Sequence, residues 1–303
     1  MSNYFYHHYY VSKTNTPSDR STKSGWMDLH KSHQYFAKNS KGSFMLIGDS
    51  IIKNLKLYDG IRQKIFGDSI IDCGIGGDLT QNILWRANDL ELSKDIEVIV
   101  IYAGTNNLYH NSPIEIVNGI LAIGILLNNK YPNKSIVIFG LLPRSLPTSS
   151  TREKINYINH HLNYICDAKD AFSFIDPGDE WKKPNDELKM DLFYRDKLHL
   201  IEKGYVKFSA MIADEFKRIM NVKKDQTRHQ KSHALYDDQY PQLAIQKNPS
   251  THNTFNSKKS YSCTVKSGRK PQYTPSKPSL PSSSISTASS TTTSTSPSTL
   301  ISS

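Results

Sequence analysis

The stretch FMLIGDS, residues 44–50, decides the fold of this chain. Its first four residues are apolar and predict a buried strand, and Gly48 and Asp49 end that run. The next segment, IIKNLKLYDGI, has rough helical periodicity, so Ser50 stands where a strand turns into a helix. A serine at such a turn has its hydroxyl at the mouth of the sheet, beside N–H groups that no helical bond uses. Ser50 is therefore either a helix cap, its commoner role there, or a nucleophile.

Two distant stretches supply partners for a nucleophilic serine. VIVIYAGTNN, residues 98–107, predicts another buried strand, and it ends in polar residues that include Asn106. YRDKLHL, residues 194–200, places Asp196 and His199 three positions apart. A serine, a side-chain amide and an Asp/His pair are the groups that acyl transfer needs. The histidine takes the serine proton, the aspartate orients the histidine, and the amide donates to the oxyanion.

In chain order, the GDS turn, GIGGD at 74–78, GTNN at 104–107 and DxxH at 196–199 resemble the four sequence blocks of the SGNH (GDSL-type) hydrolases. GIGGDLTQNILWR, YAGTNN, FGLLPR, DKLHL and the earlier WMDLHKSHQYF are most similar to the catalytic subunits of intracellular platelet-activating-factor acetylhydrolase, type Ib. The resemblance covers roughly residues 25–220. It implies a serine esterase that removes a short acyl group, such as the acetyl group of an ether phospholipid, without a metal or an organic cofactor.

The resemblance also implies roles for the matching residues. The catalytic triad would be Ser50, Asp196 and His199. The oxyanion hole would have three donors, the N–H of Ser50, the N–H of Gly77 and the side-chain amide of Asn106. Apart from the resemblance, GIGGD would be an ordinary glycine-rich turn, and the Asp/His pair would be two solvated loop residues.

A short acyl pocket is implied by the same resemblance. Its walls would be Ile51, Thr105 and Leu198, which are otherwise plain core or rim residues. Asp49 is expected to be structural and to bond neighbouring loops. Tyr102 stands where the family often has a tryptophan, which is expected to alter local packing. Packing and ion-pair roles are expected for Trp85, Arg86 and Arg144.

Strand-like and helical segments alternate along the chain. Strands are predicted at 44–48, 69–73, 96–102, 135–140 and 172–176, and helices at 50–57, 79–90, 113–130, 152–168 and 200–219. The alternation predicts an α/β fold with three α/β/α layers and a five-stranded parallel sheet, of the SGNH or flavodoxin-like kind. Ligands bind beyond the carboxyl ends of such strands. The long loop at 177–198 would bring the Asp/His pair to that edge.

Composition divides the chain into three parts. Residues 1–24 are predicted to be a disordered N-terminal segment, residues 25–221 the hydrolase domain, and residues 222–303 a disordered tail, first basic and then rich in Ser and Thr. Residues 1–220 contain 27 Lys and Arg against 25 Asp and Glu, whereas residues 221–303 contain 11 against 3. The basic character of the chain therefore belongs to the tail.

The sequence also excludes several classes of protein. Three widely spaced cysteines, Cys73, Cys166 and Cys263, argue against a disulfide framework and for a reducing compartment. No cysteine or histidine cluster indicates a metal site. The N-terminus lacks the apolar core of a signal peptide, and the longest apolar run, residues 119–127, is too short to span a bilayer. A cytoplasmic protein without a transmembrane segment is expected.

Two further classes of function remain open from the sequence. The family's catalytic subunits pair with each other and bind a WD-repeat regulatory partner, so the resemblance implies a homodimer and a scaffold role beside or instead of catalysis. The basic tail is also compatible with an esterase domain derived from a retroelement, for which a neighbouring reverse-transcriptase frame would be the sign. Nucleic-acid binding is not expected, because lysine pairs such as residues 258–259 usually only solvate a tail.

Overall fold

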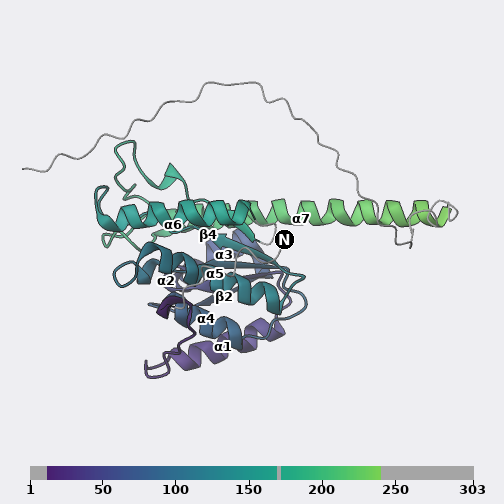
Figure 1. The fold of residues 1–303 in the computed structure, drawn as a ribbon, viewed down its shortest axis with the longest axis horizontal. Coiled ribbons are helices and arrows are strands. Elements are labelled where there is room, and N and C mark those ends of the chain that lie inside the picture. Colours follow the sequence, from purple (N-terminus) through teal and green to yellow (C-terminus); the bar gives the residue numbers. More distant parts are fainter. Residues whose placement is uncertain (1–11, 169–171, 240–303) are drawn as a thin grey trace, which may run out of the picture. The chain divides into compact units, whose positions relative to one another are not determined.

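The computed structural model describes residues 12–168 and 172–239. A sheet flanked by helices lies at its centre (Figure 1). The sheet has five strands in the order β2-β1-β3-β4-β5, and every neighbouring pair is parallel. The strands are β1 (Phe44–Gly48), β2 (Ile70–Gly74), β3 (Val98–Tyr102), β4 (Ser135–Phe139) and β5 (Phe172–Ile175). In the register, Gly48 of β1 lies beside Gly74 of β2 and Tyr102 of β3, so these strands end at one edge.

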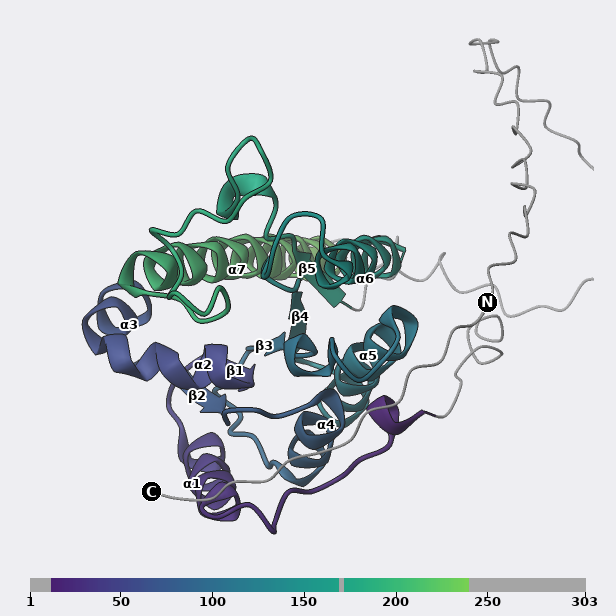
Figure 2. The same cartoon turned by 90° about the vertical axis from the view of Figure 1, so that its left-hand side faces the viewer.

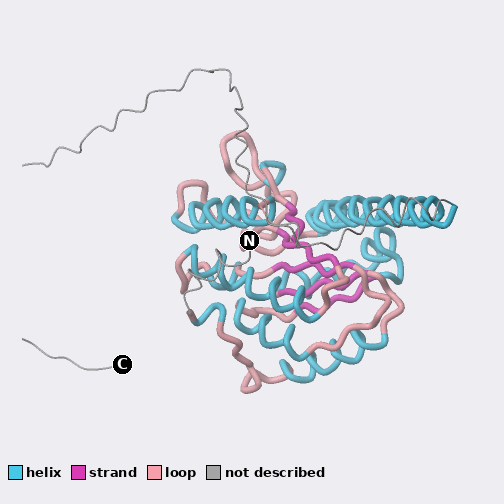
Figure 3. Tube along the Cα trace, turned by 45° about the vertical axis from the view of Figure 1, so that its right-hand side comes forward, coloured by secondary structure: helices cyan, strands magenta, loops and turns pink. Residues whose placement is uncertain are grey.

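Helices cover both faces of this sheet. The α-helices are α1 (Trp26–Asn39), α2 (Ser50–Leu55), α3 (Asp59–Phe66), α4 (Thr80–Asp89), α5 (Pro113–Lys130), α6 (Ser150–Asp167) and α7 (Glu202–Gln239). Helices α1, α4 and α5 lie on one face, and α2, α3 and α7 lie on the other (Figure 2). Figure 3 shows the strands between these two layers of helices. The expected three-layer α/β/α fold with a five-stranded parallel sheet is therefore confirmed.

Burial explains why the strands appear in the sequence as continuous apolar runs. Every residue of β1 and β3, the strands with helices on both faces, is buried. Parallel strands covered on both sides have no solvent face and therefore no polar alternation. Side chains from the sheet, α5 and the first half of α7 join one hydrophobic core that includes Ile47, Ile101, Ile120 and Phe208.

Local capping signals fix the start of α5. Ser112 is its N-cap, Pro113 is its first residue, and the N–H of Glu115 donates to the Ser112 hydroxyl. The Glu115 carboxylate accepts in return from the N–H of Ser112 at 2.8 Å, which completes a capping box. These bonds satisfy backbone donors that the first helical turn leaves free, so the predicted helix at 113–130 has the observed bounds.

The expected and observed bounds agree within two residues for all five strands and for the helices α4, α5 and α6. Two helices were not predicted as such. Residues 26–39 form α1. The segment that was predicted to be one helix at 50–57 forms α2 and a 3-10 turn at Lys56–Tyr58, which α3 follows. Gly67 has a positive φ of 59° and ends α3.

The expected ends of the folded domain are wrong on both sides. Residues 12–24 were expected to be disordered, but the Thr14 side chain is fully buried between α4 and α5 and donates to the Glu115 carbonyl at 2.7 Å. On the other side, α7 continues to Gln239 instead of ending near residue 219. The polar composition of the N-terminal segment predicted no order because Thr14 bonds to a residue 101 positions away, whereas the extension of α7 continues the hydrogen bonding of its own helix. The predictions for residues 1–11 and 240–303 lie outside the described residues.

Within the described ranges, none of the helices combines the length and the apolar character needed to cross a bilayer.

Candidate active site

The turn that carries Ser50 joins β1 directly to α2. Asp49 is the N-cap of α2, and its side chain accepts from the N–H of Ile51 at 2.9 Å. A Cβ on Gly48 would lie 2.4 Å from the Tyr102 carbonyl oxygen, so only glycine fits between β1 and β3 at this point. The capping role therefore belongs to Asp49, and the Ser50 side chain is left to make other contacts.

Ser50 is in direct contact with the predicted Asp/His pair. The Ser50 hydroxyl oxygen lies 3.0 Å from His199 Nε2, and His199 Nδ1 lies 2.6 Å from a carboxylate oxygen of Asp196. The other Asp196 oxygen accepts from the backbone N–H groups of Leu198 and His199, both at 3.0 Å. Because these two N–H groups fix the Asp196 carboxylate, the carboxylate can hold the His199 imidazole in its position beside Ser50.

The charge of Asp196 suits this geometry. Partial burial raises the pKa of the Asp196 carboxyl, but the hydrogen bonds from the His199 ring and from two backbone N–H groups outweigh it, so the pKa is lowered. Asp196 is therefore a carboxylate at neutral pH. It accepts from His199 Nδ1, which leaves Nε2 free to take a proton from Ser50.

The predicted oxyanion residues lie at the same edge of the sheet, beyond the carboxyl ends of the strands. Gly77 has a positive φ of 78° in the loop that follows β2, and the Asn106 amide donates to the Asp78 carbonyl at 2.9 Å. Gly77, Asn106 and Leu198 line one cavity of about 380 Å³. A side-chain amide has two N–H groups, so Asn106 keeps one donor beyond its bond to the loop.

A buried arginine, Arg86, bonds to the ends of β1 and β2 and to the loop that contains Gly77. The Arg86 side chain, on α4, has no exposed surface. It donates to the carbonyls of Gly48 and Cys73 and to the Asp78 carboxylate, each at 2.8 Å. Arg86 thereby connects the end of β1, the end of β2 and the glycine loop. The sequence predicted an ion pair for Arg86 but not these partners.

The N-terminal segment also reaches this loop. Arg20 donates to the Asp78 carboxylate at 3.1 Å, and Trp26 Nε1 donates to the same oxygen at 2.8 Å. Arg20 also lines the cavity with Gly77 and Asn106. Sequence reasoning missed Arg20, because its partner is 58 positions away and no local pattern connects the two.

The three expected acyl-pocket residues differ in position. Leu198 lines the cavity. The side chains of Ile51 and Thr105 are buried, and the Thr105 hydroxyl accepts from Arg144 at 3.2 Å. The Arg144 guanidinium also lies 5.2 Å from the centre of the Tyr109 ring. Of the three predicted wall residues, only Leu198 borders the open space beside the oxyanion residues.

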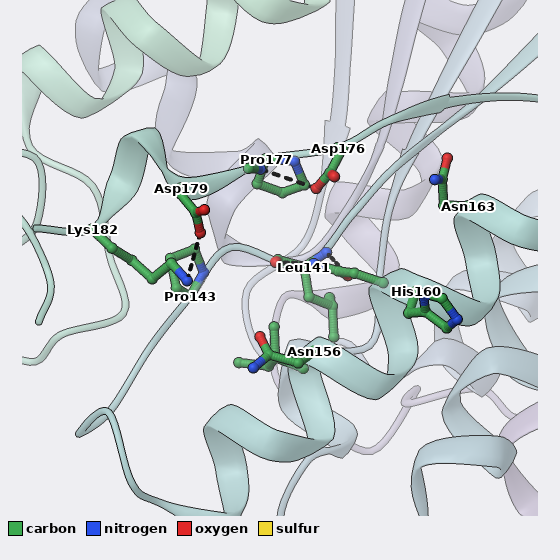
Figure 4. A pocket seen from close by; sticks show the side chains of 12 residues that line it. Leu141, Pro143, Asn156, His160, Asn163, Asp176, Pro177, Asp179 and Lys182 are labelled. Carbon is green, nitrogen blue, oxygen red and sulfur yellow. Dashed lines mark hydrogen bonds and ion pairs between the residues drawn. The ribbon is translucent and has the colours of Figure 1, made fainter. Parts of the chain in front are cut away.

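A separate cavity of about 280 Å³ opens beside α6 (Figure 4). Asn156, His160 and Asn163 of α6 line it together with Asp176 and Asp179 of the loop after β5. None of the predicted site residues lines it. In residues 12–168 and 172–239, no group of three His, Cys, Asp or Glu side chains is arranged to hold a metal ion.

Asp49 gives a pH-dependent prediction for stability. Burial raises the pKa of its carboxyl to about 7, against the opposing effects of the Ile51 N–H and of nearby arginines. The unfolded chain loses this proton near the ordinary carboxyl pKa, whereas the folded chain keeps it. The stability that depends on this proton is complete at low pH and is lost as the pH rises toward 7. One pKa unit is ~1.36 kcal/mol, so the loss is on the order of 4 kcal/mol.

Asp49→Asn tests this, because asparagine keeps the capping oxygen without a charge. Relative to wild type, the variant should gain free energy of unfolding between pH 4 and pH 7 and gain nothing further above pH 8. Urea denaturation of both proteins across this range measures the difference. A difference that stays constant with pH would show that Asp49 does not hold a proton in the folded state.

Comparisons with known proteins show which family the chain resembles. The family model described as "GDSL-like Lipase/Acylhydrolase family" matches residues 46–207. "Platelet-activating factor acetylhydrolase IB subunit alpha2" of Homo sapiens is 30% identical over 184 residues, which cover 60% of this chain and 79% of that protein. The alpha1 subunit of Bos taurus is 29% identical over 196 residues, which cover 64% and 84%.

Among solved structures, a GDSL-like lipase from Bacteroides thetaiotaomicron has the same fold. It has a TM-score of 0.54 and 16% identity, over 64% of this chain and 97% of that one. The match to the family model extends from β1 to the start of α7, and so includes Ser50, Asn106 and His199. The chain therefore belongs to the GDSL-like lipase/acylhydrolase family and is a carboxylic ester hydrolase.

Proposed function

We propose that the protein hydrolyses short-chain acyl esters, acetyl esters foremost, with Ser50 as nucleophile, His199 as general base and Asp196 as the residue that orients His199. The observation that supports this most directly is the pair of contacts from Ser50 to His199, 3.0 Å, and from His199 to Asp196, 2.6 Å. The first distance allows proton transfer from Ser50 to His199, and the second is a hydrogen bond through which Asp196 orients the imidazole.

In the first half of the reaction, the Ser50 oxygen attacks the ester carbonyl carbon while its proton moves to His199 Nε2. The imidazolium that forms is stabilised by the Asp196 carboxylate. The carbon–oxygen bond to the alcohol then breaks, and His199 returns the proton to the departing alcohol. In the second half, a water molecule loses its proton to His199 and attacks the acyl-serine. The bond between the acyl carbon and the Ser50 oxygen then breaks, and His199 gives its proton to that oxygen. The products are the free acid and the restored Ser50 hydroxyl.

Negative charge develops on the carbonyl oxygen in both halves. We assign its stabilisation to the N–H of Ser50, the N–H of Gly77 and the amide of Asn106. The assignment is supported by the position of Gly77 and Asn106 along one cavity. It is also supported by the bond from Arg86 to Asp78, which fixes the loop that contains Gly77. Donors held in place before the reaction do not have to reorganise when the charge forms.

The preference for acetyl groups is supported by the names of the relatives, which are acetylhydrolases. It is also supported by the branched side chain of Leu198 at the cavity and by Ile51, which is buried directly after the nucleophile. An acetylated ether phospholipid such as platelet-activating factor is the substrate that these relatives suggest. Leu198, the predicted wall residue that borders this cavity, remains the proposed wall of the acyl pocket.

A chain-length series of p-nitrophenyl esters tests this proposal. The kcat/KM for butyrate and hexanoate should be roughly ten- to a hundredfold below that for acetate, because overpacking against branched walls costs about 1–3 kcal/mol. Leu198→Ala should narrow this gap, while Leu57→Ala, which changes an exposed leucine after α2, should leave it as it is. A wild-type preference for octanoate would contradict the short pocket.

A further inference from the structure

Three cationic side chains gather around the glycine pair that precedes Asp78. A Cβ placed on Gly77 would lie 3.4 Å from an Arg20 guanidinium nitrogen and 3.7 Å from Lys23 Nζ. A Cβ placed on Gly76 would lie 3.8 Å from Lys53 Nζ and 3.9 Å from the Ser50 Cβ. The three cations therefore stand within a few ångströms of the loop that carries a proposed oxyanion donor, and beside the proposed nucleophile.

These cations come from two parts of the chain. Arg20 and Lys23 come from the N-terminal segment, where Arg20 is bonded to Asp78 and Lys23 Nζ donates to the Gly76 carbonyl at 3.0 Å. Lys53 comes from α2, one turn after Ser50. The ordered N-terminal segment thus contributes one wall of the site, a role that the resemblance did not imply.

Acidic side chains neutralise only part of this cluster. Asp78 is fully buried and already pairs with both Arg20 and Arg86. Within the described ranges, Lys23 and Lys53 form no ion pair. The pKa of Lys23 is lowered, first by partial burial and then by the positive charge of Arg20, which places the two cations in one electrostatic environment. Asp78 is therefore the acidic partner of two arginines, and the two lysines add positive charge beside them.

Of the three cations, Arg20 borders the cavity, and Lys23 and Lys53 do not line it. Arg20 lines it together with Gly77, Asn106 and Arg144. The Arg144 guanidinium donates to the hydroxyls of Thr105 and Tyr109, whereas Lys23 has one carbonyl partner and both lysines can donate to a further group. A desolvated anion would gain from several such cations at once, and a carboxylate or phosphate matches the guanidinium fork of Arg20.

We propose that Arg20, Lys23 and Lys53 bind an anionic group, a phosphate monoester or a carboxylate, on the alcohol portion of the substrate. The inference rests on the proposed ester hydrolysis at Ser50. The acyl group is assigned to Leu198, which shares the cavity with Arg20, and the two lysines outside that lining are left for the alcohol portion. The N-terminal segment would then select substrates by the charge of the leaving group.

Two matched pairs of acetate esters test this with the full chain. One pair is p-nitrophenyl acetate and 5-acetoxy-2-nitrobenzoate, which adds a carboxylate, and the other is acetylglycerol and acetylglycerol 3-phosphate. Wild type should prefer the anionic member of at least one pair in kcat/KM, mainly through KM. The pair with the larger preference identifies the anion. The preference should fall at 0.5 M salt, because exposed charges are screened.

Arg20→Gln with Lys23→Gln should lower the ratio of anionic to neutral kcat/KM roughly tenfold, as expected for two charges removed near the surface. Asp78 keeps Arg86 and Trp26 as partners in this variant. Lys23→Gln alone, which removes only one hydrogen bond to a carbonyl, should lower the ratio roughly threefold. The control, Lys31→Gln with Lys64→Gln, removes the same charge from exposed positions on α1 and α3 and should keep the wild-type ratio.

The outcomes separate this inference from the proposed function. The anion site would be overturned if wild type turned over neutral and anionic esters with equal KM. It would also be overturned if the double variant left the ratio of anionic to neutral kcat/KM unchanged in both pairs. Either result would leave ester hydrolysis standing. An equal fall in kcat for both members would likewise overturn it, because that result places the cations on the reacting oxygen. Failure to hydrolyse any of the four esters would overturn both.

Discussion

Ser50→Ala should lower kcat for p-nitrophenyl acetate by at least about 10⁴-fold, because the proposed chemistry has no other nucleophile and only binding and oxyanion effects would remain. The fold should not change. Asp49 caps α2, and its bond to the Ile51 N–H does not involve the Ser50 side chain. Alanine also favours the helix. Steady-state kinetics and a thermal melt of the same preparation measure both effects.

Ser32→Ala is the matched control, since it removes a hydroxyl that bonds only a carbonyl in its own helix, α1. It should keep wild-type kcat. A Ser50→Ala variant that melts at the wild-type temperature and retains most of its activity would assign the chemistry to a different group.

Asn106→Ala should have the second largest effect. The loss of one preorganised oxyanion donor costs about 2.7–4 kcal/mol in the transition state, which is roughly a hundred- to a thousandfold in kcat. KM should change little, because the carbonyl oxygen gains full negative charge only after the attack. The bond from Asn106 to the Asp78 carbonyl faces the loop and contributes a smaller structural effect.

The next residue provides a control of the same type. Asn107 is fully buried, accepts from the Thr80 N–H at 3.0 Å and donates to Gln81 and Asn111. Asn107→Ala should therefore cost about 1–3 kcal/mol of stability through an unpaired buried group, with a much smaller effect on kcat. If Asn106→Ala instead raises KM at constant kcat, Asn106 binds substrate and is no oxyanion donor.

The sequence predicted the parts of the site that depend on local patterns. An apolar run followed by Gly48, Asp49 and Ser50 specifies a buried strand and a sharp exit into a helix, and the structure has both. Parallel strands then require their carboxyl ends to meet at one edge. That rule is enough to bring Ser50 and Asn106 to the same edge although 56 positions separate them in the chain.

The rest depends on contacts that no local pattern contains. Arg86 reaches two strand ends and Asp78, and the partner of Arg20 is 58 positions away. The segment around Thr14 is polar and short, so composition predicted disorder. Its order comes from bonds to the Glu115 carbonyl and from the Thr80 hydroxyl, which anchor it between α4 and α5. Arg20 is at the cavity because these bonds hold the segment there.

Covalent labelling tests the central claim, that Ser50 is the nucleophile of an esterase, most directly. Wild type is inactivated with a fluorophosphonate, digested and mapped by mass spectrometry. The account predicts one phosphonyl group per chain, on the peptide that contains Ser50, with loss of esterase activity in proportion to labelling. Stoichiometric labelling of another residue, or full activity after Ser50 is labelled, would contradict it.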